Sequence, residues 1–274
     1  MLWELPGGTM MKLSRICLVT CGLLSLAACG EDATPSETLR ILVTNDDGVE
    51  AEGIDELVEA LTSNPANEVI VCAPDGNRSG SGDTTGPSQR CGNLSVFATT
   101  TRSGYPSTAI DGCPADAVNY ALDSLYPDGS PPDVVIAGIN EGQNISAVIS
   151  SLSGTVGAAK TAARRGVPSL AASQGLAPDD VPPDYPAGAR AVLTWLEQRR
   201  SALGAGTAPT TADSVNIPTC TAGAIRGTLV GLPLASSAEG AVDPQNCEST
   251  LDDPADDVQA FVNGFTTLTT VPLD

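Results

Sequence analysis

From residue 40 onward, the hydrophobic positions switch between the two periods that distinguish strands from helices. Four short runs rich in apolar and β-branched residues predict strands, at 40–44, 68–73, 133–138 and 168–173. Between and after them, apolar side chains recur every three or four residues, as on the buried face of a helix. This spacing predicts four helices, at 52–62, 114–125, 155–165 and 187–203. Apolar strands that alternate with helices indicate an α/β fold, which we expect to be a Rossmann-like three-layer sandwich around a parallel sheet.

The C-terminal part of the chain has a different composition. Residues 204–260 are rich in Gly, Pro, Ser, Thr and Asp and show few helical stripes. Short strands are predicted near 214–218 and 226–231, and an acidic loop over 248–257. A last strand near 264–271 is expected to return to the body of the protein. The predicted fold therefore includes an extended C-terminal segment.

The N-terminal residues have the composition of an export signal. A short basic segment over 11–15 precedes an apolar stretch over 16–28, which is too short for a comfortable membrane span. The stretch closes on Leu26-Ala27-Ala28-Cys29, which resembles the lipobox of bacterial lipoproteins. In that motif the cysteine, here Cys29, is lipid-modified and becomes the mature N-terminus. An ordinary cleaved signal with a chance cysteine is the alternative.

These features predict a simple domain organisation. We expect residues 1–28 to be a signal peptide of the lipoprotein type and 29–38 to be a polar tether. Residues 39–274 would then form one α/β domain. The protein would be exported to the bacterial cell envelope, as a lipid-anchored periplasmic protein or in secreted form. Its contact with a membrane would be through the lipid anchor alone.

Charge and composition exclude several classes of function. The net charge of −20 argues against binding to a nucleic-acid duplex, which requires clustered Lys and Arg residues. The sequence contains no histidine, so it excludes Ser-His-Asp and Cys-His mechanisms and His-ligated zinc sites. Catalysis by this chain must therefore use carboxylates, hydroxyls, amides or a bound metal ion.

The cysteines suit an oxidising compartment. Cys91, Cys113, Cys220 and Cys247 would pair as two disulfides, for which three connectivities are possible. We favour Cys91–Cys113 and Cys220–Cys247, because each pair closes a local, loop-rich segment. Cys72 lies inside an apolar run and is expected to be a small buried hydrophobic residue.

Polar residues follow three of the predicted strands at the point where each strand ends. Asp46 and Asp47 follow the first strand, Ser79 lies in the Gly/Ser loop after the second, and Asn140 follows the third. Ligands of parallel sheets bind beyond the carboxyl ends of the strands, so we expect these side chains to converge. Together they form an all-oxygen set that suits Mg²⁺, Mn²⁺ or Ca²⁺. Taken singly, the Asp pair can be a turn or capping site and Ser79 a plain loop residue.

A possible anion site lies before one predicted helix. Ser153, Gly154 and Thr155 are small residues at the start of the helix, where free N–H groups can bind phosphate. Ser and Thr are also common as helix N-caps without any ligand. The segment therefore becomes a phosphate site only if the metal site lies beside it.

Five ordered segments resemble a known family. They are ILVTNDDGVEAEGI, VIVCAPDGNRSGSG, AIDGCPADAVNYAL, VVIAGINEGQNI and SGTVGAAKTAARRGVPSLAAS. Together they are similar to the SurE survival-protein family of metal-dependent 5′/3′-nucleotidases, which are acid-phosphatase-like phosphomonoesterases. The resemblance is dense over roughly residues 39–175 and returns at 216–218 and 257–273. It implies hydrolysis of nucleoside 5′- or 3′-monophosphates to nucleoside and phosphate, with Mg²⁺ or Mn²⁺ as cofactor.

The resemblance also implies roles for individual residues. The metal ligands would be Asp46, Asp47, Ser79 and Asn140, with Asp46 and Asp47 as the catalytic carboxylates. We take Asp46 as the candidate base or nucleophile, because it is the first residue beyond the strand end with a free carboxylate edge. Substrate or phosphate would be bound by Asn45, Asn144, Ser153, Gly154 and Thr155. Members of the family commonly form homodimers or tetramers through C-terminal elements, so we expect a homo-oligomer.

The chain departs from the family pattern near the site. Asp83 and Glu141 stand where the family often has histidine, and these two carboxylates would repel phosphate. The alternative function is therefore a catalytically weak nucleotide- or metal-binding module of the envelope. A dinucleotide-binding oxidoreductase is disfavoured, because the first strand ends in NDDG and not in a G-x-G-x-x-G turn.

Overall fold

The computed structural model describes residues 38–126, 129–178 and 181–274. The chain divides into two units, 1–35 and 36–274, and the described residues belong to the second. The expected signal peptide, Cys29 and nearly all of the tether lie outside the described residues. Within the described part, no helix combines the length and hydropathy needed to cross a membrane.

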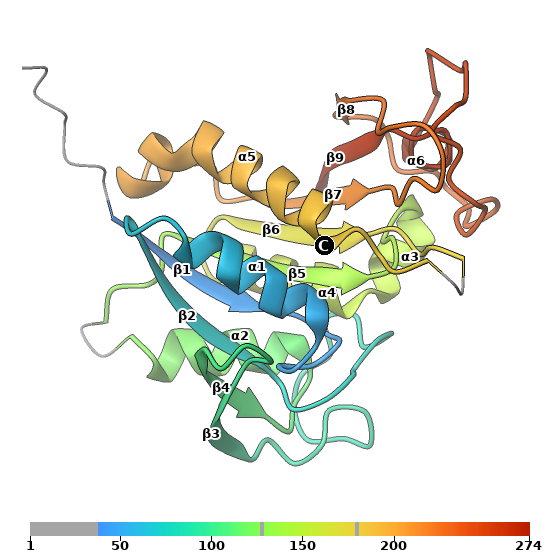
Figure 1. The fold of residues 1–274 in the computed structure, drawn as a ribbon. Coiled ribbons are helices and arrows are strands. Elements are labelled where there is room, and N and C mark those ends of the chain that lie inside the picture. The colour runs from blue at the N-terminus through green and yellow to red at the C-terminus, as the bar shows by residue number, and fades with distance from the viewer. Residues whose placement is uncertain (1–37, 127–128, 179–180) are drawn as a thin grey trace, which may run out of the picture. The chain divides into compact units, whose positions relative to one another are not determined.

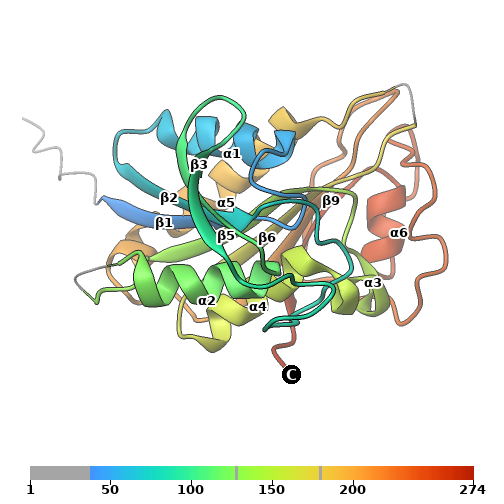
Figure 2. The same cartoon turned by 90° about the horizontal axis from the view of Figure 1, so that it is seen from below.

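A sheet of nine strands forms the centre of the unit (Figures 1 and 2). The strands are β1 Leu39–Thr44, β2 Asn67–Pro74, β3 Val96–Thr100, β4 Pro106–Ile110, β5 Val134–Glu141, β6 Ser169–Gln174, β7 Ala212–Ile217, β8 Thr228–Val230 and β9 Thr266–Val271. Their order across the sheet is β3-β4-β2-β1-β5-β6-β7-β9-β8. The six neighbouring strands β4, β2, β1, β5, β6 and β7 run parallel to one another. The pairs β3/β4 and β7/β9 are antiparallel. The predicted parallel core is confirmed, and the sheet as a whole is mixed.

Helices cover both faces of this sheet. They are α1 Glu52–Thr62, α2 Pro114–Ser124, α3 Ser146–Leu152, α4 Gly154–Arg164, α5 Tyr185–Gly204 and α6 Asp257–Val262. Alternate residues of β1 show how the layers form: Ile41 and Val43 pack in the cluster with α1 and α5, and Leu42 packs in the cluster with α2 and α4. The two clusters lie on opposite faces, which confirms the three-layer sandwich.

The eight strands and helices predicted for the first 203 residues are all present, with bounds close to those expected. Four elements were not predicted. Strand β3 lies at the sheet edge and has no buried residue, and Phe97 is 48% exposed, so its apolar pattern is weak. Strand β4 begins at a proline, and α3 and α6 span only seven and six residues. A helix of two turns is too short for a helical hydrophobic period to show.

The structure contains the two local disulfide pairs favoured from the sequence. Cys91 and Cys113 have their Cα atoms 4.5 Å apart, and those of Cys220 and Cys247 are 5.7 Å apart. Cys72 is buried, as expected for a small hydrophobic residue, and forms no disulfide with another described cysteine. The second pair joins two loops of the C-terminal segment, whose strand β9 lies against β7.

Candidate functional site

Three adjacent strands bring the predicted site residues to one edge of the sheet. Strand β1 lies between β2 and β5, so the polar segments that follow these strands meet at their carboxyl ends. A cavity of about 270 Å³ lies at this edge, and Asp46, Ser79 and Asn140 line it. The convergence predicted from the sequence is therefore confirmed for these three residues.

Asp46 is held by the start of helix α4. Its carboxylate is 3% exposed, and the Thr155 hydroxyl donates a 2.6 Å hydrogen bond to Oδ1. A Cβ atom added to Gly154 would lie only 2.8 Å from Oδ2, so glycine permits the close approach of helix and carboxylate. Burial raises the pKa of Asp46 above its ordinary value, and the hydrogen bond from Thr155 opposes part of that shift.

Asn45 closes the turn that presents the two aspartates. Its Nδ2 donates to the Gly48 carbonyl at 2.8 Å, and its Oδ1 accepts from the Gly48 amide at 3.2 Å. Gly48 has a φ of +110°, and a Cβ there would lie 3.0 Å from the Cα of Gly76. The Asn45 side chain is fully buried and is not among the residues that line the cavity. The geometry thus gives Asn45 a role in the turn, and it does not bring the residue to the predicted phosphate position.

Asp47 borders the site from a different side. Its Oδ2 accepts from the amide of Glu141 at 2.9 Å, and its Oδ1 accepts from Asn77 Nδ2 at 3.2 Å. Burial and the neighbouring charges of Asp46 and Glu141 raise the pKa of Asp47 to about 7. Asp47 lines a separate, acidic hollow together with Glu141 and the residues Glu50, Ala51, Glu52, Asn77, Arg102, Pro183 and Tyr185.

Asn140 and Ser79 offer neutral oxygens to the cavity. Asn140 Nδ2 donates to the Gly142 carbonyl at 2.5 Å, and its Oδ1 has no hydrogen-bond partner among the described residues. The register shift of β5 between Ala137 and Asn140 marks an irregularity that places Asn140 at the strand end. The Ser79 hydroxyl is exposed and also lacks a partner in the described chain. Carboxylate, amide and hydroxyl oxygens in one cavity fit a hard divalent cation, which would also offset the repulsion between Asp46 and Asp47.

The start of α4 forms the other side of the cavity. Ser153 lines the cavity and caps the helix, because its Oγ accepts from the amide of Val156 at 3.1 Å. Asn144 lines the cavity as well and is fixed by two hydrogen bonds. Its Nδ2 donates to the Ser173 hydroxyl at 2.8 Å, and its backbone N–H donates to Asn216 Oδ1 at 2.7 Å. Of the five predicted substrate residues, Asn144 and Ser153 therefore line the cavity, whereas Gly154 and Thr155 contact Asp46.

Sequence reasoning missed Ser81, which belongs to the same cluster. Its hydroxyl is buried and has no hydrogen-bond partner among the described residues. A Cβ on Gly154 would lie 2.7 Å from this oxygen, so Ser81 packs against the start of α4, as Asp46 does. Its place in a Gly/Ser loop gave no signal to separate it from ordinary loop serines.

The two carboxylates that replace family histidines lie in different surroundings. Asp83 forms a 2.8 Å ion pair with Arg164, which holds the pKa of that carboxyl below its ordinary value. It does not line the cavity. Glu141 does line the cavity and also lies beside Asp47. The expected repulsion of phosphate therefore falls on Glu141, while the charge of Asp83 is balanced by Arg164.

An apolar rim, which was not predicted from the sequence, completes the cavity. We use this term for Ile149, Leu152, Leu176 and Val242, which line the cavity beside its polar floor. Leu152, Leu176 and Val242 are 59%, 46% and 72% exposed. Helix α3 supplies Ile149 and Leu152, and the C-terminal segment supplies Val242. A substrate with both an anionic and an apolar part fits this combination.

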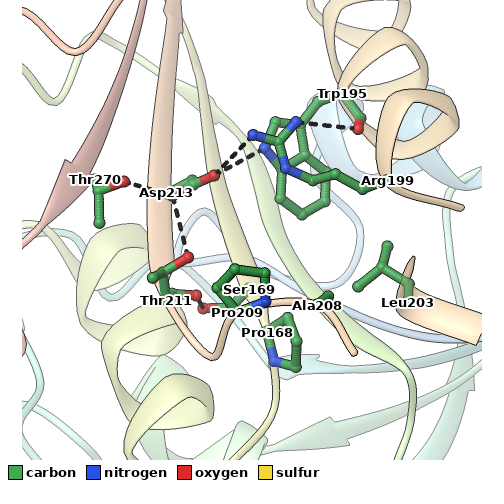
Figure 3. Close-up of a pocket in the computed structure, with 10 residues that line it drawn as sticks. All are labelled: Pro168, Ser169, Trp195, Arg199, Leu203, Ala208, Pro209, Thr211, Asp213 and Thr270. Carbon is green, nitrogen blue, oxygen red and sulfur yellow. Dashed lines mark hydrogen bonds and ion pairs between the residues drawn. The ribbon is translucent and has the colours of Figure 1, made fainter. Parts of the chain in front are cut away.

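Two other clusters of the described chain have structural explanations. A cavity of about 220 Å³ lies at the opposite ends of β6 and β7 and surrounds Asp213 (Figure 3). That carboxylate accepts from Trp195 Nε1 at 3.0 Å and from Thr270 at 2.9 Å, and it pairs with Arg199 at 3.4 Å. The group of Cys91, Cys113 and Asp116 resembles a metal site, but its two sulfurs are joined to each other.

The sequence of this chain is similar to those of known proteins. Residues 41–237 match the family described as "Survival protein SurE". The 5′-nucleotidase SurE of Aeromonas hydrophila subsp. hydrophila is 45% identical over 141 residues, which are 49% of this chain and 51% of that protein. The 5′-nucleotidase SurE of Pelobacter propionicus is 38% identical over 192 residues, which are 70% of this chain and 71% of that protein.

A solved structure supports the same relationship. The crystal structure of the SurE protein from Aquifex aeolicus is similar with a TM-score of 0.67 at 26% identity, over 86% of this chain and 94% of that one. The matched region nevertheless spans only about half the length of the Aeromonas relative.

Proposed function

Because the chain belongs to the SurE family, as its sequence motifs indicated, we propose that it is a metal-dependent phosphomonoesterase. Its reaction would be the hydrolysis of nucleoside 5′- or 3′-monophosphates to nucleoside and phosphate. The names of the curated relatives, 5′-nucleotidase SurE, support this substrate class. The observation that carries the proposal is the shared cavity of Asp46, Ser79 and Asn140 beside the N-terminus of α4.

The oxygen ligands of this cavity support a divalent cofactor. Asp46, Ser79 and Asn140, with Asp47 at the border, would hold Mg²⁺ or Mn²⁺. When bound, such an ion supplies Lewis-acid polarisation of the phosphoryl group. Asp46 is the candidate base or nucleophile, and Thr155 fixes its carboxylate through Oδ1. The other carboxylate oxygen, Oδ2, lies beside Gly154, where an added Cβ atom would be only 2.8 Å away.

The remaining residues would bind and orient the substrate. The N-terminus of α4, next to Ser153, would stabilise phosphoryl oxygens through the positive end of the helix dipole as charge builds in the transition state. Asn144 lies on the same wall and can donate or accept as the phosphate moves. The apolar rim would contact the nucleoside, because no charged side chain lies among its four residues.

A second function is favoured by one observation. Glu141 lines the cavity and no lysine or arginine does, so the acidic surroundings oppose a phosphate dianion. This favours a catalytically weak binding module for nucleotides or metal ions. Hydrolysis of a chromogenic phosphate ester with Mn²⁺ or Mg²⁺, with and without chelator, separates the two functions. Metal-dependent turnover supports the enzyme, whereas metal binding without turnover supports the module.

Export and assembly belong to the same proposal. The apolar stretch before Cys29 supports a lipid-anchored envelope protein, and four paired cysteines suit an oxidising compartment. A shift of Cys29→Ser protein from membrane to soluble fractions would test the anchor. A homodimer or tetramer stays a prediction, which light scattering of the purified protein would decide.

A further inference from the structure

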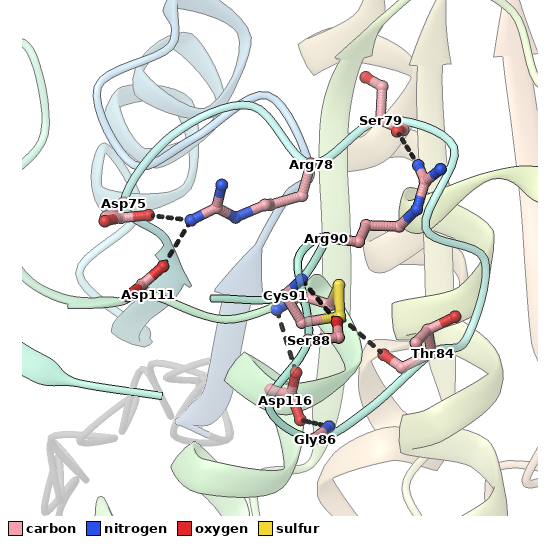
Figure 4. Close-up of a disulfide and its surroundings, with 11 residues drawn as sticks. Asp75, Arg78, Ser79, Thr84, Gly86, Ser88, Arg90, Cys91, Asp111 and Asp116 are labelled. Atoms are coloured by element: carbon pink, nitrogen blue, oxygen red, sulfur yellow. Dashed lines mark hydrogen bonds and ion pairs between the residues drawn. A yellow bond between two sulfur atoms is a disulfide. The ribbon is translucent and has the colours of Figure 1, made fainter. Parts of the chain in front are cut away.

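Arg90 lies at the edge of the candidate site. Its Nη1 donates to the carbonyl oxygen of Ser79 at 3.2 Å. A Cβ on Gly80, which lines the site cavity, would lie 3.3 Å from the same nitrogen. Figure 4 shows the side chain extending from its own loop toward Ser79. The guanidinium group therefore reaches the loop that supplies one of the proposed metal ligands.

The positive charge of Arg90 is not balanced by a carboxylate within the described residues. Other arginines form ion pairs there: Arg78, Arg102, Arg164, Arg165, Arg199, Arg200 and Arg226. Arg78 lies close by but is held by both Asp75 and Asp111, at 2.8 and 2.7 Å. In the described part of the chain, the Arg90 side chain donates one hydrogen bond, to a neutral carbonyl oxygen. Its remaining donors are available to an anion.

The surroundings give this charge a function. The carboxylates Asp47 and Glu141 border the cavity on one side and repel an approaching dianion. A second, open hollow of about 720 Å³ is lined by Asn77, Arg78, Ser79, Ser88, Gln89 and Arg90, and it shares Asn77 with the acidic hollow. Ser79 is shared by this hollow and the site cavity. An anionic substrate in a chain of net charge −20 therefore has a favourable approach on the Arg90 side.

The loop that carries Arg90 is fixed on both sides of the residue. The next residue, Cys91, is buried and bonded to Cys113 at the N-cap of α2. Earlier in the loop, the amide of Gly86 donates to Asp116 at 2.8 Å, as Figure 4 shows. A guanidinium on such an anchored loop loses less conformational freedom on binding than one on a free loop.

We propose that Arg90 is a substrate-binding residue, which attracts the phosphate of the ester to the Ser79 side of the cavity and donates to its oxygens. The ligand class is phosphate monoesters and inorganic phosphate, which a guanidinium binds through paired N–H donors. The inference rests on the proposed function, because it names the residue that compensates for the acidic surroundings of the site.

The test is steady-state kinetics of the full chain with 4-nitrophenyl phosphate and Mn²⁺. Arg90→Gln is expected to raise KM roughly tenfold or more, since a charge-assisted hydrogen bond contributes about 1.5–3 kcal/mol. The value of kcat is expected to stay near that of the wild type, and the dependence of KM on salt to become weaker. Arg90→Lys keeps the charge without the paired donors and should fall between the two.

Arg190→Gln is the matched control. Arg190 is an exposed arginine of α5 that lines neither the site cavity nor the open hollow, so its loss changes the net charge equally. The KM of the Arg190→Gln variant should equal that of the wild type. An unchanged KM in Arg90→Gln would overturn the inference. So would a lower kcat at constant KM, because that result would mean that Arg90 only supports the Ser79 loop.

Binding of inorganic phosphate separates this inference from the proposed function. If the wild-type chain hydrolyses no ester with Mn²⁺ or Mg²⁺, the proposed function fails, and calorimetry with phosphate and Mn²⁺ decides the role of Arg90. Weaker phosphate binding by Arg90→Gln than by Arg190→Gln supports the inference. Equal affinity of the two variants contradicts it.

Discussion

The hydroxyl of Thr155 donates a 2.6 Å hydrogen bond to the carboxylate of Asp46, although 109 positions separate the two residues. Asp46 follows the end of β1 by two residues and Thr155 lies in the first turn of α4, so this bond ties the proposed catalytic carboxylate to the proposed phosphate-binding helix. The bond engages Oδ1, while Oδ2 lies beside Gly154, where an added Cβ atom would be 2.8 Å away.

Asp46→Asn should abolish hydrolysis and leave the fold intact. The amide is neither a base nor a nucleophile, while its size and its ability to accept from Thr155 are those of the carboxylate. Removal of a buried charge is not expected to destabilise the chain, because burial already raises the pKa of Asp46. Turnover of 4-nitrophenyl phosphate and thermal unfolding would be measured together. Near wild-type turnover would refute the role assigned to Asp46.

Thr155→Val should lower kcat without abolishing it. Valine has nearly the shape of threonine but cannot donate, so Asp46 loses a hydrogen bond that contributes about 1–3 kcal/mol where it is buried. We expect kcat to fall by roughly tenfold or more through the freed carboxylate. Thr155→Ser, which keeps the donor, is the control and should keep most of the activity. Equal loss in both variants would point to packing of the methyl group and not to the hydrogen bond.

Gly154→Ala should damage the site more than a glycine substitution elsewhere in it. The new Cβ would lie 2.7 Å from Ser81 Oγ and 2.8 Å from Asp46 Oδ2, closer than packed atoms tolerate. We expect destabilisation of about 1–3 kcal/mol together with a strong loss of kcat. Gly76→Ala is the matched control, because a Cβ there meets no atom within 4 Å. Urea unfolding and ester hydrolysis of both variants would show whether the two effects separate as expected.

Much of the fold and the centre of the site could be predicted from the sequence. The parallel topology follows from apolar strands that alternate with helices, and it places Asp46, Ser79 and Asn140 together without any knowledge of distances. The role of Asn45 could not be predicted, because the same side chain can contact a ligand or close a turn.

Contacts between segments that are distant in the chain could not be predicted from the sequence. The ion pair between Asp83 and Arg164 depends on how the loop that follows β2 packs against α4. The apolar rim joins α3, which is too short to show a helical period, with Val242 of the C-terminal segment. Each of these residues has an unremarkable neighbourhood in sequence, and only tertiary packing gives it a partner.

The metal requirement should depend on Asn140. Asn140→Ala removes the amide oxygen that has no partner in the described chain and leaves both carboxylates in place. We expect a rise of roughly tenfold in the Mn²⁺ concentration for half-maximal activity, with activity partly restored at high Mn²⁺. A chelator should remove all activity from wild type and variant, and excess Mn²⁺ should restore it. An unchanged metal requirement would remove Asn140 from the ligand set.

The ion pair of Asp83 with Arg164 should make part of the stability dependent on acid pH. The hydrogen bond and charge of Arg164 lower the folded-state pKa of Asp83 below the ordinary value of 3.8, so folding favours the ionised form. This stabilisation is present above pH about 4 and is lost as the pH falls through the lower folded-state pKa. Its size is small, because both side chains are partly exposed, at 38% and 45%.

Asp83→Asn tests this dependence on pH directly. The variant cannot lose an ion pair that it lacks, so its Tm should fall less than that of the wild type between pH 5 and pH 3. At pH 7 its Tm should be slightly lower than that of the wild type. Glu248→Gln is the control, since this exposed carboxylate forms no ion pair in the described chain and should follow the wild-type profile. Parallel pH profiles for all three proteins would show that the Asp83–Arg164 pair contributes nothing measurable in solution.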